Sequence, residues 1–351
     1  MSGASETKPI SKRALEDFAA VLLQAGGFSE EYARQSAELL VWANMRGADS
    51  HGVLRIPRYI EMVELGIVKG RAEPIVSHEF GAICRLDGDL VPGAAGMSMA
   101  AKKAIELAGK FGIGLCEISR TSHAGAIGYF AEKIAQAGMI GIVMSASKPL
   151  MVYHGARGEG VSTNPIAISA PAGDTGNPLI FDMSTAAVAL GKIMAAKDAG
   201  HSIPLDWAVN AEGVPTADPA EAKAVLPMAG PKGSGLSLMI EIVVSVLGGN
   251  PLISAALSEK KDNGFNGLAI AINPLAFGLS HPVAEDIAAL AQAIKALPPA
   301  AGVDEVLLPG ERGYLTAARR SADGIPIAAG TAKRLSQEGT KLGVAVPAEF
   351  S

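Results

Sequence analysis

The feature that most restricts the fold is an alternation of apolar, strand-like stretches with helix-like stretches through the middle of the chain. Buried-strand patterns occur at residues 82–88, 112–119, 139–147, 165–172, 178–184 and 265–274, and helical patterns lie between them at 95–112, 125–138, 185–200 and 233–249. Such alternation packs helices against a largely buried sheet. Aromatic residues make up only 5% of the chain, so the layers must be filled mainly by Ala, Val, Ile, Leu and Met. The sequence therefore predicts an α/β layer structure.

Helical patterns also precede and follow this central part. Ser11 and Ser29 stand directly before two amphipathic stretches, where their side chains can cap the first helical turns. The chain becomes helical again after residue 283. We therefore expect an N-terminal helical segment on the substrate side (1–80), a central α/β domain (81–280) and a C-terminal helical segment that packs with the N-terminal part (281–351).

Charge and composition exclude several classes of partner. The formal net charge is -5 and no run rich in lysine or arginine occurs, so we expect no nucleic acid and no anionic membrane as partner. No apolar segment reaches the ~20 residues that a membrane span needs, and no apolar secretion signal is visible. Cys84 and Cys116 lie in apolar stretches and are expected to be buried thiols. These features predict a cytoplasmic location.

The densest polar chemistry lies in residues 48–59, ADSHGVLRIPRY, directly after the second helical stretch. It contains His51, and a second histidine, His123, stands just before another helical pattern. The positive end of a helix dipole favours a neutral imidazole, so such a histidine could act as a general base near pH 7. For either histidine alone, a capping or surface residue is the alternative interpretation. No histidine pair has the spacing of a zinc site, so no metal is predicted.

The common dinucleotide-binding motif is missing, because no G-x-G-x-x-G follows a strand. The sequence GPKGSG at 230–235 begins a helical pattern, where free N–H groups and Lys232 could bind an anion. A plain glycine-rich turn is the alternative. The strand pattern that ends at Asp182 is followed by Ser184 and Thr185, either of which is expected to cap the next helix.

Taken together, seven segments resemble one family, the NAD(P)-dependent malate/L-lactate dehydrogenases of the second type. This family includes ureidoglycolate and sulfolactate dehydrogenases, diketogulonate reductase and a cyclic-imine reductase. The matching segments occur in the family's order and are DSHGVLRIPRY, ISRTSHAGAIGYF, STNPIAISAP, FDMSTAAVALGKI, IPLDWAVNAEGVPTADP, LPMAGPKGSGLSLMIEI and LPGER. The resemblance implies a mixed-sheet fold that is not a Rossmann fold, with NAD or NADP held in the central domain. It also implies a homodimer whose active site lies near the subunit interface.

The resemblance implies roles for individual residues as well. Ser50, His51, Arg55 and Tyr59 would face a small acidic substrate, and Arg55 offers the bidentate fork that a carboxylate needs. His123 would be the base in the ureidoglycolate branch, whereas other branches assign proton transfer to the position of His51, so the choice stays open. The implied cofactor contacts are Ser147, Thr163, Asn164, Asp182, Met183, Ser184, Lys232, Gly310, Glu311 and Arg312.

Two positions depart from the family pattern. Ser162 replaces the usual glycine before Thr-Asn, a change that bears on a turn or on a cofactor contact. Lys148 stands where the ureidoglycolate branch has an acid, and a lysine would attract an anion instead. We hypothesise that Lys148 binds a second acidic group of the substrate, as in malate or sulfolactate. The alternative is a solvated surface lysine.

Three functions fit these residues. The first is an NAD(P)-dependent dehydrogenase of a small 2-hydroxy acid such as malate, lactate, sulfolactate or ureidoglycolate. The second is a reductase of a cyclic imine acid or a diketo sugar acid that uses the same histidine as an acid. The third is a non-catalytic nucleotide-binding protein, which the joint presence of His51, Arg55, His123 and Lys232 disfavours, because a sensor needs no proton-transfer groups.

Overall fold

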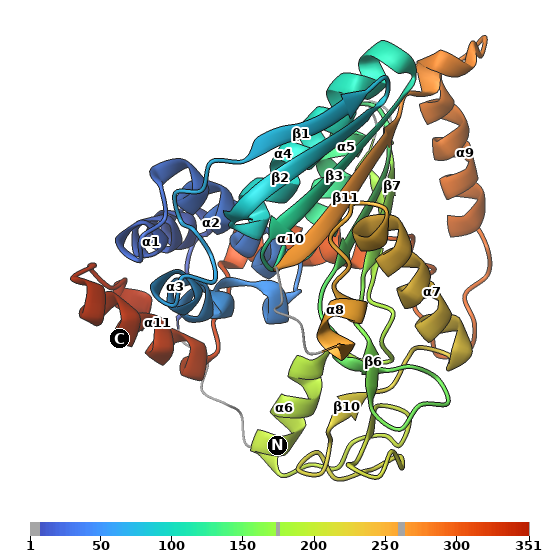
Figure 1. Cartoon of the computed structure of the whole chain (residues 1–351). Coiled ribbons are helices and arrows are strands. Elements are labelled where there is room, and N and C mark those ends of the chain that lie inside the picture. The colour runs from blue at the N-terminus through green and yellow to red at the C-terminus, as the bar shows by residue number, and fades with distance from the viewer. Residues whose placement is uncertain (1–7, 173–175, 259–263, 351) are drawn as a thin grey trace.

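The computed structural model describes residues 8–172, 176–258 and 264–350. A seven-stranded sheet forms the centre of the molecule, and a four-stranded sheet lies in a lower lobe (Figure 1). Helices from both ends of the chain pack beside the large sheet, so the predicted mixed α/β structure is confirmed. Within the described ranges, no helix has the length and apolar character that crossing a membrane would require.

The large sheet is mixed, and its strand order does not follow the chain. The strands lie in the order β1 (Ile75–Phe80), β2 (Ile83–Val91), β3 (Ile113–Thr121), β11 (Phe265–Ile272), β4 (Ile140–Ala146), β7 (Ile166–Ala170) and β8 (Leu179–Met183). β2 and β3 are parallel, whereas the other neighbouring pairs are antiparallel. The late strand β11 is thus inserted between two early ones. All six residues of β1 are exposed, without the alternation of buried and exposed residues that a half-buried strand has. This explains why the strand pattern in the sequence begins only at β2.

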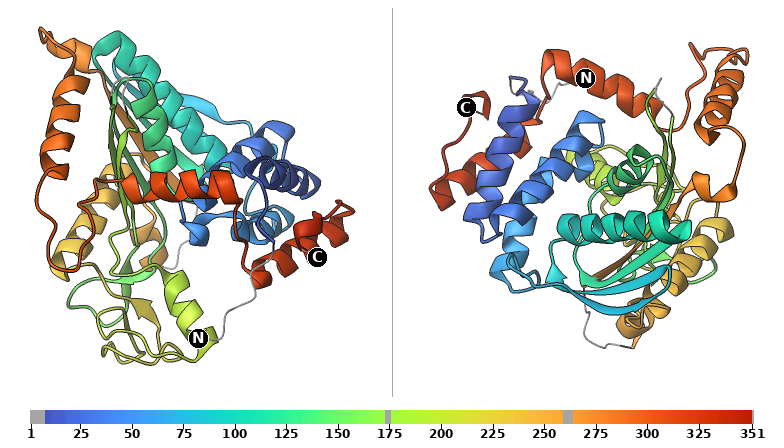
Figure 2. Two further views of the ribbon diagram at one scale, coloured as in Figure 1. Left: turned by 180° about the vertical axis from the view of Figure 1, so that it is seen from behind. Right: turned by 90° about the horizontal axis from the view of Figure 1, so that it is seen from above.

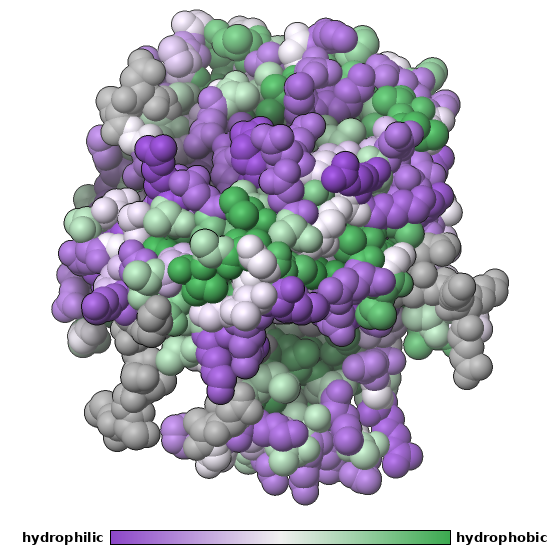
Figure 3. All heavy atoms as spheres, turned by 90° about the vertical axis from the view of Figure 1, so that its left-hand side faces the viewer, coloured by the Kyte–Doolittle hydropathy of each residue, from purple (hydrophilic) through white to green (hydrophobic). Residues whose placement is uncertain are grey.

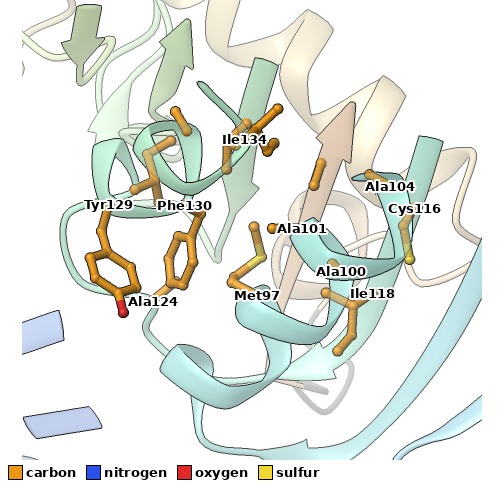
Figure 4. Packing of buried hydrophobic residues seen from close by; sticks show 14 of the residues in the cluster. Met97, Ala100, Ala101, Ala104, Cys116, Ile118, Ala124, Tyr129, Phe130 and Ile134 are labelled. Carbon is orange, nitrogen blue, oxygen red and sulfur yellow. The ribbon is translucent and has the colours of Figure 1, made fainter. Parts of the chain in front are cut away.

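One face of the sheet is covered by α4 (Gly93–Phe111) and α5 (Gly128–Gln136). Small residues bring α4 close to the sheet, since a Cβ on Gly114 would collide with the carbonyl oxygen of Ala104. Figure 4 shows the resulting core, in which alanines of α4 alternate with single large side chains such as Met97 and Phe130. This packing agrees with the low aromatic content.

The opposite face is covered only in part. α7 (Pro231–Glu241) and the π-helical turn Ile242–Val246 lie on it, where Ile240 and Val244 pack on Ala146 and Leu268. Other apolar residues on this face stay accessible, since Ile168 is 41% exposed and its cross-strand neighbour Phe181 is 44% exposed. α9 (Val283–Lys295) has no buried residue and stands apart from the sheet (Figures 1 and 2).

Helices from the two ends of the chain share one apolar core. These helices are α1 (Lys12–Ala25), α2 (Glu30–Met45), α3 (Ile56–Glu64), α10 (Glu311–Asp323), α11 (Ala329–Leu342) and the short 3-10 turn Ala348–Phe350. The predicted caps are confirmed, because the Oγ atoms of Ser11 and Ser29 accept hydrogen bonds of 3.2 Å from Ala14 N and Tyr32 N. Each such cap contributes about 1 kcal/mol.

The lower lobe contains short elements that the sequence pattern did not reveal. They are β5 (Met151–Val152), β6 (Glu159–Val161), β9 (Ala208–Val209), β10 (Ala224–Val225) and α8 (Ile253–Leu257), and a 3-10 turn (Pro274–Phe277) follows β11. The helix predicted at 185–200 is present as α6 (Leu190–Ala199), which begins later than expected. The prediction that Ser184 or Thr185 caps α6 is wrong. The segment before α6 is extended, because Ala187 N donates to Leu226 O, and the Ser184 Oγ accepts from Ala186 N within a turn.

Candidate active site

A cavity of about 420 Å³ lies where the loop between α2 and α3 meets the ends of strands in the large sheet. On the side of the molecule that carries the N-terminal helices, the surface is hollowed above the lower lobe, with apolar atoms inside the hollow (Figure 3). The cavity brings together predicted residues from distant parts of the chain. Those that line it are Ser50, His51, Arg55, His123, Ser147, Thr163, Asn164, Asp182, Met183 and Ser184.

The loop that carries His51 and Arg55 is held by polar contacts with α2 and α10. It forms two 3-10 turns, Asp49–His51 and Val53–Arg55, on either side of Gly52. A Cβ on Gly52 would overlap the side chain of Asn44, whose Oδ1 accepts from Val53 N at 2.9 Å. Both carboxylate oxygens of Asp49 accept hydrogen bonds from Arg320 of α10, at 2.7 and 3.0 Å. A helix near the C-terminus therefore positions this loop.

His51 and His123 stack in the cavity, with ring centroids 5.7 Å apart and an interplanar angle of 21°. The Nδ1 of His123 lies 2.7 Å from the hydroxyl of Tyr59 and accepts from Gly125 N at 3.4 Å. Because a backbone N–H only donates, Nδ1 is an acceptor and the neutral ring carries its proton on Nε2. The Nδ1 of His51 lies 3.0 Å from Ser50 Oγ. In both rings Nδ1 has a partner within the protein, so Nε2 is the nitrogen available to a molecule bound in the cavity.

Burial, together with the positive charge of Arg55, lowers the pKa of His51 to about 4. Burial, together with His51 and Arg55, lowers the pKa of His123 to about 3, which favours the neutral form of both rings at pH 7. The sequence attributed a neutral ring to a helix dipole, but here the cause is desolvation, because α5 begins only at Gly128. A bound carboxylate would offset the charge of Arg55 and raise both pKa values.

Arg55 is the cation of the cavity. Its Nε donates to the backbone oxygen of Ser50 at 2.8 Å, which orients the guanidinium. Among the described residues that line the cavity, it is the only lysine or arginine. A planar guanidinium held in this way can bind a carboxylate with two parallel hydrogen bonds.

The opposite wall of the cavity is rich in hydroxyl groups. Asn164 is fully buried and acts as a brace, since its Oδ1 accepts from Ser147 N at 3.2 Å and its Nδ2 donates to Ser237 O at 3.1 Å. Ser162, the departure from the family pattern, is buried, and its Oγ lies 2.6 Å from Ser147 Oγ. The extra hydroxyl is therefore used within this wall. Thr163 and Ser184 are joined there as well, because Ser184 Oγ donates to Thr163 O.

Asp182 is the last residue but one of β8, and its side chain is accessible from the cavity that it lines. Its Oδ2 accepts from Gly128 N, the first residue of α5, at 2.8 Å. Desolvation raises the pKa of Asp182 to about 6, although the Gly128 N–H and the charge of Arg46 act in the opposite direction. Its carboxylate is placed to accept a hydrogen bond from a hydroxyl of a bound molecule.

Several predicted residues do not line the cavity. Tyr59 is buried behind His123, and Lys148 is exposed beside Glu159. Lys232 is exposed on the first turn of α7, a helix that does begin within GPKGSG as predicted. The last three of the predicted cofactor contacts lie at the start of α10. Gly310 contacts Ile180, Glu311 binds Lys295 at 2.5 Å and Arg312 is exposed.

Other residues of the site were not identified from the sequence. The edge of the Phe265 ring faces His123, with centroids 6.0 Å apart, yet Phe265 lies in an ordinary strand pattern that gives no hint of this contact. Arg46 stacks on Tyr314 of α10, 3.8 Å from the ring centre, and binds Glu132 of α5 at 3.2 Å. These three side chains come from distant segments, so only the tertiary structure reveals the cluster.

Comparisons with known proteins identify the family to which the chain belongs. A family model described as malate/L-lactate dehydrogenase matches residues 10–336. Ureidoglycolate dehydrogenase (NAD(+)) of Escherichia coli strain K12 is 35% identical over 322 residues, which cover 91% of this chain and 92% of that enzyme. Malate/(S)-sulfolactate dehydrogenase of Methanothermus fervidus is 32% identical over 333 residues, or 92% of this chain and 95% of that enzyme.

A solved structure is similar over nearly the whole chain. It is that of delta1-piperideine-2-carboxylate reductase from Pseudomonas syringae pv. tomato, with a TM-score of 0.84 and 32% identity. The similarity covers 95% of this chain and 100% of that one. The resemblance expected from the sequence is thereby confirmed, and the chain belongs to the malate/L-lactate dehydrogenase family.

Proposed function

We propose that the protein is an NAD(P)-dependent oxidoreductase that interconverts small 2-hydroxy and 2-oxo acids. The observation that carries this proposal is the meeting of Arg55 with the stacked pair of His51 and His123 in one cavity. Arg55 would bind the carboxylate, and a histidine would exchange a proton with the adjacent oxygen. A binding protein would need no such pair.

The donor set of the opposite wall fits a nicotinamide nucleotide. The hydroxyls of Ser147, Thr163 and Ser184 and the carboxylate of Asp182 would contact its ribose and carboxamide groups. When bound, the nicotinamide takes up or supplies a hydride at the carbon next to the carboxylate. The name of the Escherichia coli relative favours NAD. NADP is the alternative.

His123 is the proposed proton-transfer group. Once a substrate carboxylate offsets the charge of Arg55, the ring of His123 can take up a proton. In the reductive direction its Nε2–H would donate to the oxygen that becomes the hydroxyl, while Nδ1–H stays bonded to Tyr59 Oη. In the oxidative direction the neutral ring would first have to carry its proton on Nδ1, where Tyr59 Oη accepts it, and Nε2 would then take the proton of the hydroxyl. His51, whose Nδ1 lies beside Ser50 Oγ, would contact the substrate and is the alternative proton-transfer group.

The test is a spectrophotometric assay of NADH and NADPH oxidation with a panel of 2-oxo acids. We expect turnover by the natural chain and a loss of at least about 100-fold in kcat/KM for His123→Asn and for Arg55→Met. If no 2-oxo acid and no cyclic imine acid is reduced with either cofactor, the proposal is wrong and a nucleotide-binding role is favoured.

A second candidate is the reduction of a cyclic imine acid, in which the imine carbon would receive the hydride and the histidine would protonate the imine nitrogen in place of an oxygen. It is favoured by the apolar part of the cavity wall, where Leu150, Leu190 and Phe265 could pack on ring carbons. It is also favoured by the similar solved reductase. Including one five-membered and one six-membered imine acid in the same panel separates the two activities.

We also propose a homodimer in the cytoplasm as the working form. A second copy would cover the half-exposed apolar face of the sheet around Ile168 and Phe181. It would also contact α9, which has no buried residue in the single chain. Burial of such a face is typical of permanent dimers. A cytoplasmic location remains a prediction from the sequence.

A further inference from the structure

A second, much smaller cavity lies beside Tyr59, separate from the one that would hold the substrate. Its volume is about 10 Å³, which is close to the least space that one water molecule needs. Ser36, Tyr59 and Ser122 bring three hydroxyl groups to its lining, and apolar side chains such as Phe28 complete it. A buried water typically makes about three hydrogen bonds, so this lining suits one water molecule.

The hydroxyl of Tyr59 lies near the part of this lining that Gly93 and Ser122 form. Tyr59 Oη is 3.4 Å from the backbone oxygen of His123, and a Cβ on Gly93 would be 2.4 Å from that same oxygen. Ser122 Oγ accepts a hydrogen bond from Gly93 N at 2.8 Å, so its own proton remains for another acceptor. The hydroxyl groups of Tyr59 and Ser122 thus meet around Gly93.

Ser36 reaches the same cavity from α2. Its side chain is buried, with an exposed fraction of 1%, and within the described ranges its hydroxyl has no hydrogen-bond partner. Burying a hydroxyl group without a partner is costly, and a water molecule in the cavity would remove that cost.

Proton transfer by His123 gives such a water a role. When the ring carries its proton on Nε2, Tyr59 donates its only proton to Nδ1 at 2.7 Å. When Nδ1 carries a proton, Tyr59 Oη must accept, and its own proton needs another acceptor. The backbone oxygen of His123 is 3.4 Å away, beyond the range of about 2.5–3.0 Å that O–H···O hydrogen bonds prefer. An acceptor in the small cavity would meet this need.

We propose that one water molecule occupies this cavity and accepts the Tyr59 hydroxyl proton whenever Nδ1 of His123 is protonated. The water would also accept from Ser122 Oγ and donate to Ser36 Oγ. Tyr59 remains a neutral phenol, because its O–H only rotates from Nδ1 to the water, and the reaction's proton moves at Nε2 alone. Ser36 is then a positioning residue. This inference rests on the proposed function, since it specifies how the proton-transfer group is supported.

A high-resolution crystal structure of the natural chain tests the water site directly, whatever the enzyme turns over. We expect one ordered water within about 3 Å of Tyr59 Oη, in contact with Ser36 and Ser122. A well-defined cavity without density for a water would overturn this inference and leave the proposed function intact. Failure to reduce any 2-oxo acid or cyclic imine acid would instead refute the proposed function, and the role of the water with it.

A double-mutant cycle tests the role of the water. Ser36→Ala is expected to lower kcat/KM for reduction by about three- to tenfold, because the water loses a partner. Since the charged ring is then less favourable, reduction should also decline at a lower pH. Both effects should disappear in the Tyr59→Phe background, where no hydroxyl proton needs an acceptor.

Equal effects of Ser36→Ala in the two backgrounds would show a merely structural role and would overturn the inference. Ser98→Ala is the matched control, because it removes a partly buried serine hydroxyl that bonds to Ala94 O within α4 and lies outside both cavity linings. It is expected to change neither kcat/KM nor the pH profile.

Discussion

At the scale of single residues, Tyr59 shows how the fold changes a role that the sequence suggested. It follows Arg55 by one helical turn, yet its side chain is buried and its hydroxyl lies 2.7 Å from the Nδ1 of His123. We therefore regard Tyr59 as a positioning residue for His123 and not as a group that touches the substrate. It sets the orientation of the ring and accepts Nδ1–H when the ring is charged.

For Tyr59→Phe we expect kcat to fall about tenfold, the effect of losing one hydrogen bond to a charged group, while KM for the acid changes little because Arg55 stays in place. Without an acceptor for Nδ1–H, the charged ring is less favourable, so the rate of reduction should decline at a lower pH than in the natural chain. Steady-state kinetics from pH 5 to pH 9 measure both effects. Tyr153→Phe, at an exposed tyrosine, is the control. An unchanged pH profile would argue against the positioning role.

Glu117 is a second residue whose behaviour follows from its surroundings. It lies on β3 and is 3% exposed, and burial raises its pKa to about 8 against the opposing charge of Arg85. The pKa in the folded chain is above the ordinary value of 4.5, so the stabilising contribution is complete below that value and is lost as the pH rises through about 8.

For Glu117→Gln we expect a smaller loss of unfolding free energy between pH 6 and pH 9 than in the natural chain, because the amide never has to ionise in place. Denaturant midpoints at the two pH values provide the measurement. Glu79→Gln removes an exposed carboxylate and controls for the change in net charge. Parallel pH dependence in all three proteins would show that Glu117 ionises without cost.

At the scale of elements, the loop with His51 and Arg55 depends on α10. The ion pair between Asp49 and Arg320 joins segments that are 271 positions apart, and Arg320 also donates to the backbone oxygen of Asn44. The C-terminal part of the chain is thus required for the geometry of a site to which it contributes no described lining residue. The cluster of Arg46, Glu132 and Tyr314 fixes the same helix to α2 and α5.

For Asp49→Asn we expect kcat/KM to fall about tenfold, mainly through a higher KM for the acid, because Arg55 and His51 are held less precisely. The melting temperature should fall by only a few degrees, since the Asp49 side chain is half exposed. Kinetics and a thermal melt test the two parts. Glu61→Gln breaks an exposed ion pair with Arg58 on α3 and should change neither. Equal kinetics for the two variants would refute the proposed link to α10.

At the scale of the whole molecule, the exposed apolar face of the large sheet is the main unexplained surface. Ile168 and Phe181 lie side by side on it, and both are more than 40% exposed. A single domain in water would not leave such strands uncovered, so a partner surface is expected.

We expect the natural chain to have the mass of a dimer of 35.8-kDa subunits in sedimentation or light-scattering measurements at micromolar concentration. Phe181→Ser should weaken the dimer, because it removes a large apolar side chain from the proposed contact. Val21→Ser, on the exposed side of α1, should leave the mass unchanged. A monomeric natural chain would contradict the proposal.

The type of most elements follows from local patterns. Helical periodicity and the serines Ser11 and Ser29 predict the first helices and their caps, and both are confirmed. The apolar runs predict most strands of the large sheet, because burial on both faces requires continuous apolar residues. The extended segment before α6 was missed, since its pairing partner Leu226 lies far along the chain.

By itself the sequence determined the α/β class and ten of the residues that line the cavity, because periodicity and motif chemistry are local properties. The tertiary structure decided that β11 lies between β3 and β4. It also decided which side chains of residues 48–59 line the cavity. Arg55 lines the cavity, Tyr59 is buried with its hydroxyl on His123, and Lys148 is exposed outside the cavity lining. These outcomes depend on contacts between distant segments. The stability of such contacts cannot be read from a local sequence pattern.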